Sequence, residues 1–226
     1  MPGPNHKPFI APRPVGGSYT FGGRQGRMSP TRQRAFDELV PRYAVNTPIA
    51  CDQPFIVEIG CGAGEATAAM APSDVGSLVI ACEPNAAMIA NLATLLDAEA
   101  TANVRLWVGD AFDLLDLLGP GSVSELRVWF PDPWPKPRQA QKRLFTPQRL
   151  ALLTDALAVG GLLRLATDDA GYAAEALAAI EAEARLVGAI VPRPAARPIT
   201  RFEARGLHEG RAAIDIEARR LSPCVI

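Results

Sequence analysis

Short apolar runs alternate with helical patterns through the middle of the chain. The apolar runs are bounded by turn residues, as buried strands are, and lie at residues 55–60, 78–83, 104–109, 128–130 and 161–167. Amphipathic or alanine-rich stretches follow them at about residues 64–71, 85–98, 111–118, 147–158 and 169–186. Strands and helices that alternate in this way predict an α/β fold, in which helices cover both faces of a parallel sheet.

Residues at the starts of three helical stretches support this prediction. Asn85 precedes the second stretch, and an asparagine side chain at that place accepts a hydrogen bond from the first helical turn. Pro147 suits a first helical turn because its missing N–H is not needed there. Asp168 or Asp169 is suited to cap the helix that follows.

The last part of the chain has a different pattern. Residues 186–191 and 211–219 look like two strands with no helix between them. A hairpin-like pair there would close one edge and give a mixed seven-stranded sheet. We find no internal repeat and no linker, so we expect a single domain over residues 21–226, preceded by a flexible tail at 1–20.

The segment 128–143 (VWFPDPWPKPRQAQKR) interrupts the alternation. Prolines stand at four positions between residues 131 and 137, and each fixes its own φ and lacks an N–H. Asp132 lies between two of them and is therefore biased to an extended conformation. We expect a stiff loop that holds the Asp132 carboxylate at the end of the fourth strand.

Composition limits the class of protein. The chain has 226 residues, of which 48% are hydrophobic and 21% charged, as in ordinary globular proteins. No apolar run reaches the length of about 20 residues that a membrane helix needs, and residues 1–14 lack the apolar core of a signal peptide. The four cysteines have no C-x-x-C spacing, which argues against a zinc cluster. We expect a cytoplasmic protein with no bound metal and no membrane partner.

Charge is segregated along the chain although the net charge is only −1. Residues 1–36 and 133–154 contain lysine and arginine but no acidic residue, so the remainder is acidic. Two basic tracts on an acidic body suit a polyanion that docks at one place, or else they are solubilising surface.

A glycine-rich turn and several acids follow the strands, where ligands bind in open α/β sheets. The turn reads G-x-G-x-G and is followed by Glu65, so it departs from the dinucleotide fingerprint. Glu58 precedes Gly60 and Gly62 of this turn, and Glu83 and Asp110 close the second and third strands. These carboxylates would repel a pyrophosphate, but they suit an ammonium, a ribose and an adenine amine. S-adenosylmethionine therefore fits better than NAD.

Five motifs give the chain a resemblance to a known family. They are residues 23–27 (GRQGR), 57–62 (VEIGCG), 130–136 (FPDPWPK), 166–168 (ATD) and 192–203 (PRPAARPITRFE). With these motifs the chain resembles the tRNA (guanine-N7)-methyltransferases, which methylate guanine 46 in the variable loop of tRNA. The resemblance covers about residues 20–220 and implies a Rossmann-like class I S-adenosylmethionine methyltransferase.

The resemblance also implies roles for single residues. Asp132 would be catalytic, and the cofactor pocket would be lined by Glu58, Gly60, Gly62, Glu83, Asp110 and Asp132. The substrate contacts would be Lys136, Asp168, Thr200, Arg201, Phe202 and Glu203. Arg138, Lys142 and Arg143 would contact RNA, although relatives often have R-H-H-K-R-R where this chain has R-Q-A-Q-K-R.

The chemistry agrees with this assignment. Guanine N7 carries an in-plane lone pair and no proton, so its methylation needs no general base, and we assign neither His6 nor His208 to catalysis. Asp132 or Asp168 would hold the Watson–Crick edge of the base, and Trp134 or Phe202 would stack on it. We expect tRNA to be the substrate, with no obligatory protein partner and with either a monomer or a homodimer as the active form.

Two alternatives remain open at the level of sequence. One is a methyltransferase that uses the same cofactor on another RNA or on a small molecule. The other is a non-catalytic RNA-binding relative that has kept its cofactor site.

Overall fold

The computed structural model of the chain describes residues 28–46, 49 and 53–222. Its strands are β1 (Phe55–Ile59), β2 (Leu78–Cys82), β3 (Val104–Trp107), β4 (Val123–Trp129), β5 (Leu157–Thr167), β6 (Leu186–Val191) and β7 (Ile214–Arg220). Its α-helices are α1 (Pro30–Glu38), α2 (Val40–Tyr43), α3 (Glu65–Met70), α4 (Ala86–Ala98), α5 (Ala111–Leu118), α6 (Pro147–Ala156), α7 (Ala170–Ala182) and α8 (Arg201–His208). Two 3₁₀ helices, η1 (Ala71–Ser73) and η2 (Pro137–Lys142), complete the set. The motif at 23–27, the expected tail at 1–20, Cys51 and Cys224 lie outside the described residues.

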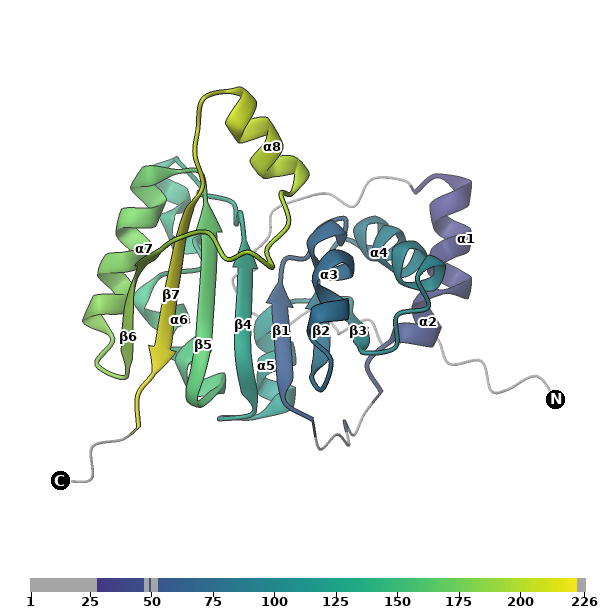
Figure 1. The fold of residues 1–226 in the computed structure, drawn as a ribbon, viewed down its shortest axis with the longest axis horizontal. Coiled ribbons are helices and arrows are strands. Elements are labelled where there is room, and N and C mark those ends of the chain that lie inside the picture. The colour runs from purple at the N-terminus through teal and green to yellow at the C-terminus, as the bar shows by residue number, and fades with distance from the viewer. Residues whose placement is uncertain (1–27, 47–48, 50–52, 223–226) are drawn as a thin grey trace.

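The strands form one seven-stranded mixed sheet (Figure 1). The order is β3-β2-β1-β4-β5-β7-β6, in which β1 to β5 pair in parallel and β7 runs antiparallel to both neighbours. The direction of winding changes between β1 and β4, because β2 and β3 follow β1 on one side and β4 starts the other side. The predicted fold class is confirmed, and the switch point lies beyond the carboxyl ends of β1 and β4.

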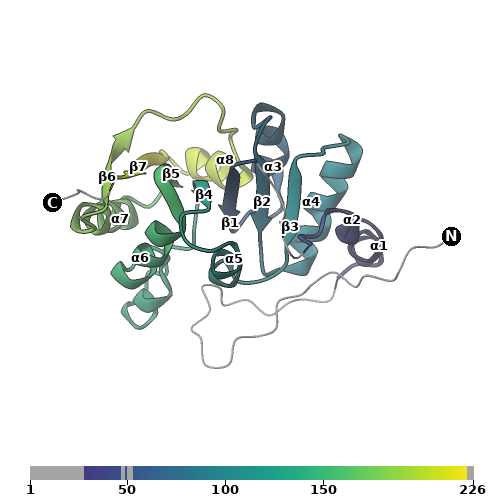
Figure 2. The same ribbon diagram turned by 90° about the horizontal axis from the view of Figure 1, so that it is seen from below.

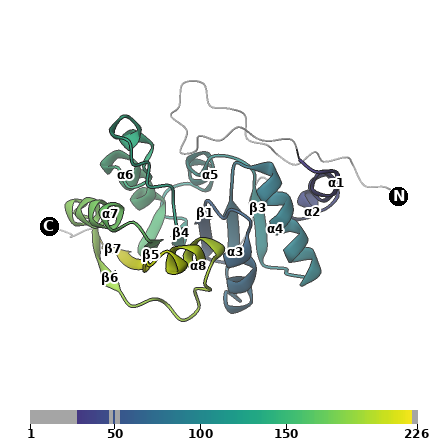
Figure 3. The ribbon, with the colours of Figure 1, turned by 90° about the horizontal axis from the view of Figure 1, so that it is seen from above.

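Alternate residues of β1 and β2 pack in different hydrophobic clusters on the two faces of the sheet, and a third, smaller cluster joins Trp129 and Ala166 to Ala66 and Met70 of α3. On β1, Ile56 packs in the core that contains α1 to α4, whereas Val57 and Ile59 pack in the core beneath α5, α6 and α7. On β2, Val79 and Ile80 divide in the same way. Figures 2 and 3, which look along the strands, show α5, α6 and α7 on one face and α3 and α8 on the other. Burial on both faces explains why these strands are continuous apolar runs.

The predicted helix starts are confirmed at three places. The Asn85 side chain accepts a hydrogen bond from Ala87 N at 3.0 Å at the start of α4. Asp169, rather than Asp168, caps α7, and α6 begins at Pro147. Among the described residues, no helix has both the length and the apolar character needed to cross a membrane.

The expectation of two strands with no helix between them is wrong. Helix α8 lies between β6 and β7, and β7 begins at Ile214 rather than at residue 211. Thr200 caps α8 by accepting a hydrogen bond from Glu203 N at 3.1 Å. The segment therefore carries the T-x-x-E signature of a helix start, which the strand interpretation overlooked. The short helices α1 and α2 were also not predicted, because α1 is largely polar and α2 has only four residues.

Candidate functional site

A glycine turn joins β1 to α3 at the switch point. Gly60, Gly62 and Gly64 have φ angles of 74°, 55° and 82°, which favour glycine. A Cβ on Gly64 would also lie 2.5 Å from Leu92 side-chain atoms of α4. The amides of Gly60 and Cys61 donate to Cys82 O at 2.8 and 3.1 Å, so the turn is tied to the end of β2.

Glu83 holds the same turn from the end of β2. Its carboxylate accepts hydrogen bonds from Gly62 N at 3.2 Å and from Asn85 N at 2.9 Å. Burial raises the pKa of Glu83 above its ordinary value, the two hydrogen bonds oppose this, and the charge of Asp132 adds to the rise. The Asp132 carboxylate, on the loop after β4, therefore lies close enough to Glu83 for the two charges to interact.

Glu58 is a nearly buried acid below the turn, with an exposed fraction of 2%. The Thr67 hydroxyl of α3 donates to its carboxylate at 2.8 Å. Burial raises the pKa of Glu58 from 4.5 to about 7, and the hydrogen bond from Thr67 opposes the rise. A cation placed against Glu58 would therefore favour the ionised form.

A cavity of about 340 Å³ opens between this turn and the carboxyl end of β4. Glu58 and the residues of the turn line one side, with Met88 of α4. Trp129 and Phe130 at the end of β4 line another side, together with the three residues at the start of α8, which are Thr200, Arg201 and Phe202. The buried Trp129 Nε1 has no hydrogen-bond partner among the described residues.

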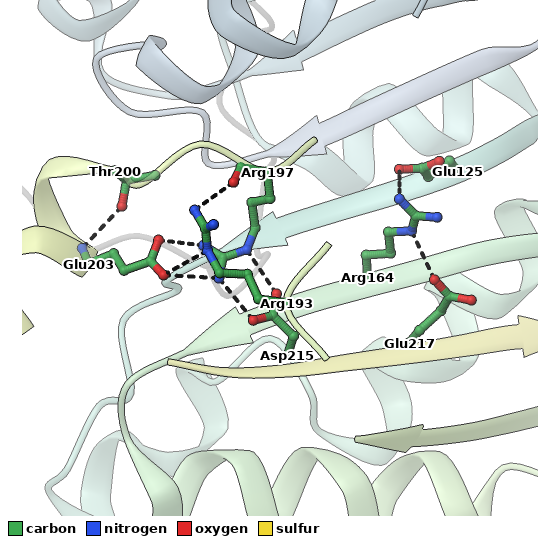
Figure 4. Close-up of polar contacts among 8 residues, drawn as sticks. All are labelled: Glu125, Arg164, Arg193, Arg197, Thr200, Glu203, Asp215 and Glu217. Atoms are coloured by element: carbon green, nitrogen blue, oxygen red, sulfur yellow. Dashed lines mark hydrogen bonds and ion pairs between the residues drawn. The ribbon is translucent and has the colours of Figure 1, made fainter. Parts of the chain in front are cut away.

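Helix α8 is fastened to the rest of the molecule by a buried ion-pair network (Figure 4). The fully buried Arg197 donates to Glu203 at 2.6 and 3.1 Å and to Asp215 of β7 at 2.8 and 2.9 Å. Its guanidinium carbon lies 5.7 Å and 5.5 Å from the ring centroids of Trp129 and Phe130. Arg197 thus connects α8, β7 and the end of β4 beside the cavity.

The network contains residues that sequence analysis did not single out. Arg193, more exposed than Arg197, donates to Glu203 at 3.2 Å and to Arg197 O at 2.6 Å. Glu203, expected to be a substrate contact, has an exposed fraction of 4% and is enclosed by these two arginines. Arg197 lies within the motif at 192–203 and could have been singled out there. Its pairing with Asp215 could not, because the two residues are distant in sequence.

At the rim of the cavity, α8 meets α3. Arg201 Nε forms an ion pair with Glu65, the first residue of α3. Phe202 beside it has an exposed fraction of 69%. The ring and the ion pair are therefore both accessible to solvent beside the cavity.

The other residues singled out from the sequence lie outside the lining of this cavity. Asp110 caps α5 by accepting from Phe112 N at 2.9 Å. Asp168 pairs with Arg211 at 2.8 Å next to α8. Asp132 and Lys136 are exposed on the proline loop. The described residues contain no group of His, Cys, Asp or Glu arranged to hold a metal ion.

The proline loop has the irregular structure that its sequence predicts. Residues 131–135 form neither helix nor strand. Phe130 and Trp134 have positive φ angles of 52° and 43°, which are uncommon for residues other than glycine. The Lys142 ammonium lies 4.7 Å from the centroid of the Trp134 ring, in cation–π contact.

Comparison with known proteins agrees with this geometry. Residues 52–216 match the family model described as "Putative methyltransferase". The tRNA (guanine-N(7)-)-methyltransferase of Streptomyces avermitilis is 35% identical over 219 residues, covering 90% of this chain and 76% of that protein. The enzyme of the same name from Leifsonia xyli is 36% identical over 229 residues, covering 95% of this chain and 98% of the other.

A solved structure has the same architecture. The rRNA methylase of Streptococcus thermophilus superposes with a TM-score of 0.51 at 16% identity, over 87% of this chain and all of that one. At this identity the likeness concerns the fold, which is the Rossmann-like fold of class I S-adenosylmethionine methyltransferases. With its sequence similarity over nearly the whole length, this chain belongs to the family of tRNA (guanine-N7)-methyltransferases.

Proposed function

We propose that this protein transfers a methyl group from S-adenosylmethionine to N7 of guanine 46 in the variable loop of tRNA. The observation that carries the proposal is the cavity at the switch point, which is bounded by the glycine turn and by the motif residues of β4 and α8. Similarity to relatives named tRNA (guanine-N(7)-)-methyltransferase supports the substrate and the atom. Position 46 is what the resemblance of the sequence motifs to this family implies.

The residues at and just beyond the carboxyl ends of β1 to β4 fit the cofactor. The set we propose for holding it comprises Glu58, Gly60, Gly62, Glu83, Asp110 and Asp132. The volume of about 340 Å³ lies within the usual range for small-molecule sites, roughly 300–1,000 Å³. Ionised Glu58 would balance the α-ammonium, and Glu83 would accept hydrogen bonds from ribose hydroxyls. Bound S-adenosylmethionine supplies an activated methyl group on a sulfonium.

The chain itself has to orient the base, because N7 needs no deprotonation. Good orientation contributes roughly 7–11 kcal/mol to a reaction of two bound partners. We propose Asp132 as the catalytic residue, since a carboxylate beside the guanine stabilises the positive charge that the base acquires. Asp132 or Asp168 would accept hydrogen bonds from guanine N1–H and the exocyclic amine, which excludes adenine.

The rim of the cavity would receive the substrate. Thr200, Arg201 and Phe202 line the cavity, and Lys136 lies exposed on the loop that carries Asp132. Glu203 would support these residues through its ion pair with Arg197. The exposed Phe202 or the half-buried Trp134 would stack on a guanine extruded from the folded tRNA. Arg138 and Lys142 would contact phosphates.

The decisive experiment uses an unmodified tRNA transcript and cofactor labelled in the methyl group. We expect label in the RNA and chain cleavage at 7-methylguanosine 46, and no label in a transcript with adenosine at that position. Label elsewhere in the RNA would refute the proposed atom or position. Absence of label with folded protein would refute the activity.

Asp132→Asn tests the catalytic assignment. We expect kcat to fall steeply with little change in cofactor Kd, because the amide keeps the shape but loses the charge. Asp116→Asn, an exposed acid of α5, serves as the control and should keep the normal rate. A normal kcat for the Asp132 variant would remove this residue from the role.

We further propose that residues 21–226 form one methyltransferase domain that works in the cytoplasm without a second kind of subunit. Full activity of the purified chain alone would support this. Activity that appears only after addition of another protein would overturn it.

A further inference from the structure

Arg143 ends the basic segment 138–143, but its side chain faces the proline loop. Its Nε donates to Pro133 O at 2.8 Å, and one terminal nitrogen donates to Trp134 O at 3.2 Å. The other terminal nitrogen pairs with Glu175 of α7. All three guanidinium nitrogens are thus used within the protein, and the exposed fraction of the side chain is 19%.

The backbone around Arg143 is itself anchored. Arg149 of α6 donates to Arg143 O at 2.8 Å, and Arg143 N donates to Ala140 O at 3.0 Å. The next amide, Leu144 N, donates to the hydroxyl of Tyr172 of α7 at 3.3 Å. Because its backbone is anchored in this way, the Arg143 side chain extends from a fixed point to the groups that it binds.

The loop after β4 needs such a support. Its prolines limit the conformations of Asp132 but leave open where the loop lies as a whole. Trp134 has a φ of 43°, and a strained residue of this kind persists only where its surroundings hold it. The two carbonyls that Arg143 binds belong to Trp134 and to the residue that directly follows Asp132.

We infer that Arg143 is a positioning residue that fixes the loop carrying Asp132 through the carbonyls of Pro133 and Trp134, and that it is not a phosphate contact. The inference rests on the proposed function, in which Asp132 acts on the base. It divides the basic segment into two parts. Arg138, exposed on η2, is free to meet RNA, whereas the charge of Arg143 is directed into the protein.

Two substitutions separate a support from an RNA contact. Arg143→Lys keeps the charge but cannot span two carbonyls and a carboxylate with one ammonium. We expect its kcat at saturating tRNA to fall roughly 10- to 100-fold, as expected when a reacting group is displaced by about 1 Å, with cofactor Kd unchanged. Arg143→Met removes the charge, and we expect the dependence of tRNA affinity on salt to stay that of the wild type.

Matched variants provide the controls. Arg138→Met should lower the slope of log K against log salt by about 0.7–0.9, the change expected for one lost phosphate contact. Glu175→Gln removes the outer ion pair and leaves both carbonyl bonds, so kcat should change less than about twofold for an exposed partner of this kind. Thermal melting of every variant gives the folded fraction by which the rates are corrected.

The inference is overturned if Arg143→Met lowers the salt slope as Arg138→Met does, or if Arg143→Lys keeps the wild-type kcat per folded molecule. A lower melting temperature with unchanged corrected kcat would also overturn it, since the role would then be structural only. The rate is read as total label transferred to tRNA, so the result holds even if the methylated atom is not N7. Failure of the proposed function would appear instead as no transfer by the wild type.

Discussion

Replacing Arg197 by methionine is expected to be among the most destabilising single changes in this protein. Methionine has a comparable reach but no donor, so the substitution removes four hydrogen bonds and leaves Glu203 and Asp215 without their buried counter-charge. Both carboxylates have an exposed fraction of only 4%, so water cannot replace the guanidinium.

The magnitude follows from the burial of all three groups. Breaking a buried ion pair by removing one partner costs about 3–5 kcal/mol, because an uncompensated charge remains in the interior. With a urea slope of about 3 kcal/mol per M, the unfolding midpoint should fall by roughly 1–2 M. Loss of the guanidinium beside the Trp129 and Phe130 rings should also loosen the cavity wall and weaken cofactor binding.

Urea unfolding followed by circular dichroism measures this change. Arg193→Met is the matched control, since Arg193 also pairs with Glu203 but has an exposed fraction of 37%. We expect it to cost about 1–2 kcal/mol, less than Arg197→Met, because Arg193 is itself exposed and Glu203 keeps its pair with Arg197. Equal midpoints for the two variants would refute the reasoning, because burial would then not determine the cost.

Three further predictions concern the cavity. Glu58 has a pKa of about 7 in the folded protein against 4.5 ordinarily, so the folded state binds the proton more tightly and wild-type stability should fall by roughly 3 kcal/mol as pH rises from 4.5 to above 7. Urea titrations at pH 5 and pH 8 should show this loss of stability in the wild type but not in Glu58→Gln. An equal loss of stability in both proteins would contradict the prediction. Gly64→Ala should lower the free energy of unfolding by about 1–3 kcal/mol and weaken cofactor binding, because the new methyl group meets Leu92. Gly76→Ala is the control: its φ is also positive but the space around it is open, so thermal melting should show a smaller loss of stability. Arg201→Ala should leave the melting temperature unchanged, because its ion pair is exposed, but should raise KM for tRNA; an unchanged KM would exclude Arg201 from substrate binding.

Much of the fold was predictable because strands that are buried on both faces of a sheet have continuous apolar sequences. Continuous apolar runs marked β1 to β5, and Asn85 and Pro147 marked two helix starts. Helix α8 was missed because it is short and polar outside its capped first turn. The sequence around Thr200 contains that cap, but the two flanking strands were interpreted as a hairpin-like pair with no helix between them.

The carboxyl ends of parallel strands meet at one edge of the sheet, and this rule placed Glu58 at the cavity, whereas Glu83, Asp110 and Asp132 lie outside its lining. The role of an arginine was harder to predict. Arg138 and Arg143 look alike as charges in a basic segment, and only the structure shows that Arg143 binds backbone carbonyls of a neighbouring loop. Arg197 was missed for a similar reason, because its partner Asp215 becomes a neighbour only when β7 joins the sheet.

The cavity joins segments that are far apart in the order of synthesis. Its floor contains Glu58 and the glycine turn, whereas one wall is residues 200–202 on α8. A nascent chain released only as far as β5 would possess most of the sheet, yet that wall would not have been made. Ligand binding would then begin only once α8 has been synthesised, so the cofactor would stabilise chains that contain this helix and leave shorter ones exposed to proteolysis.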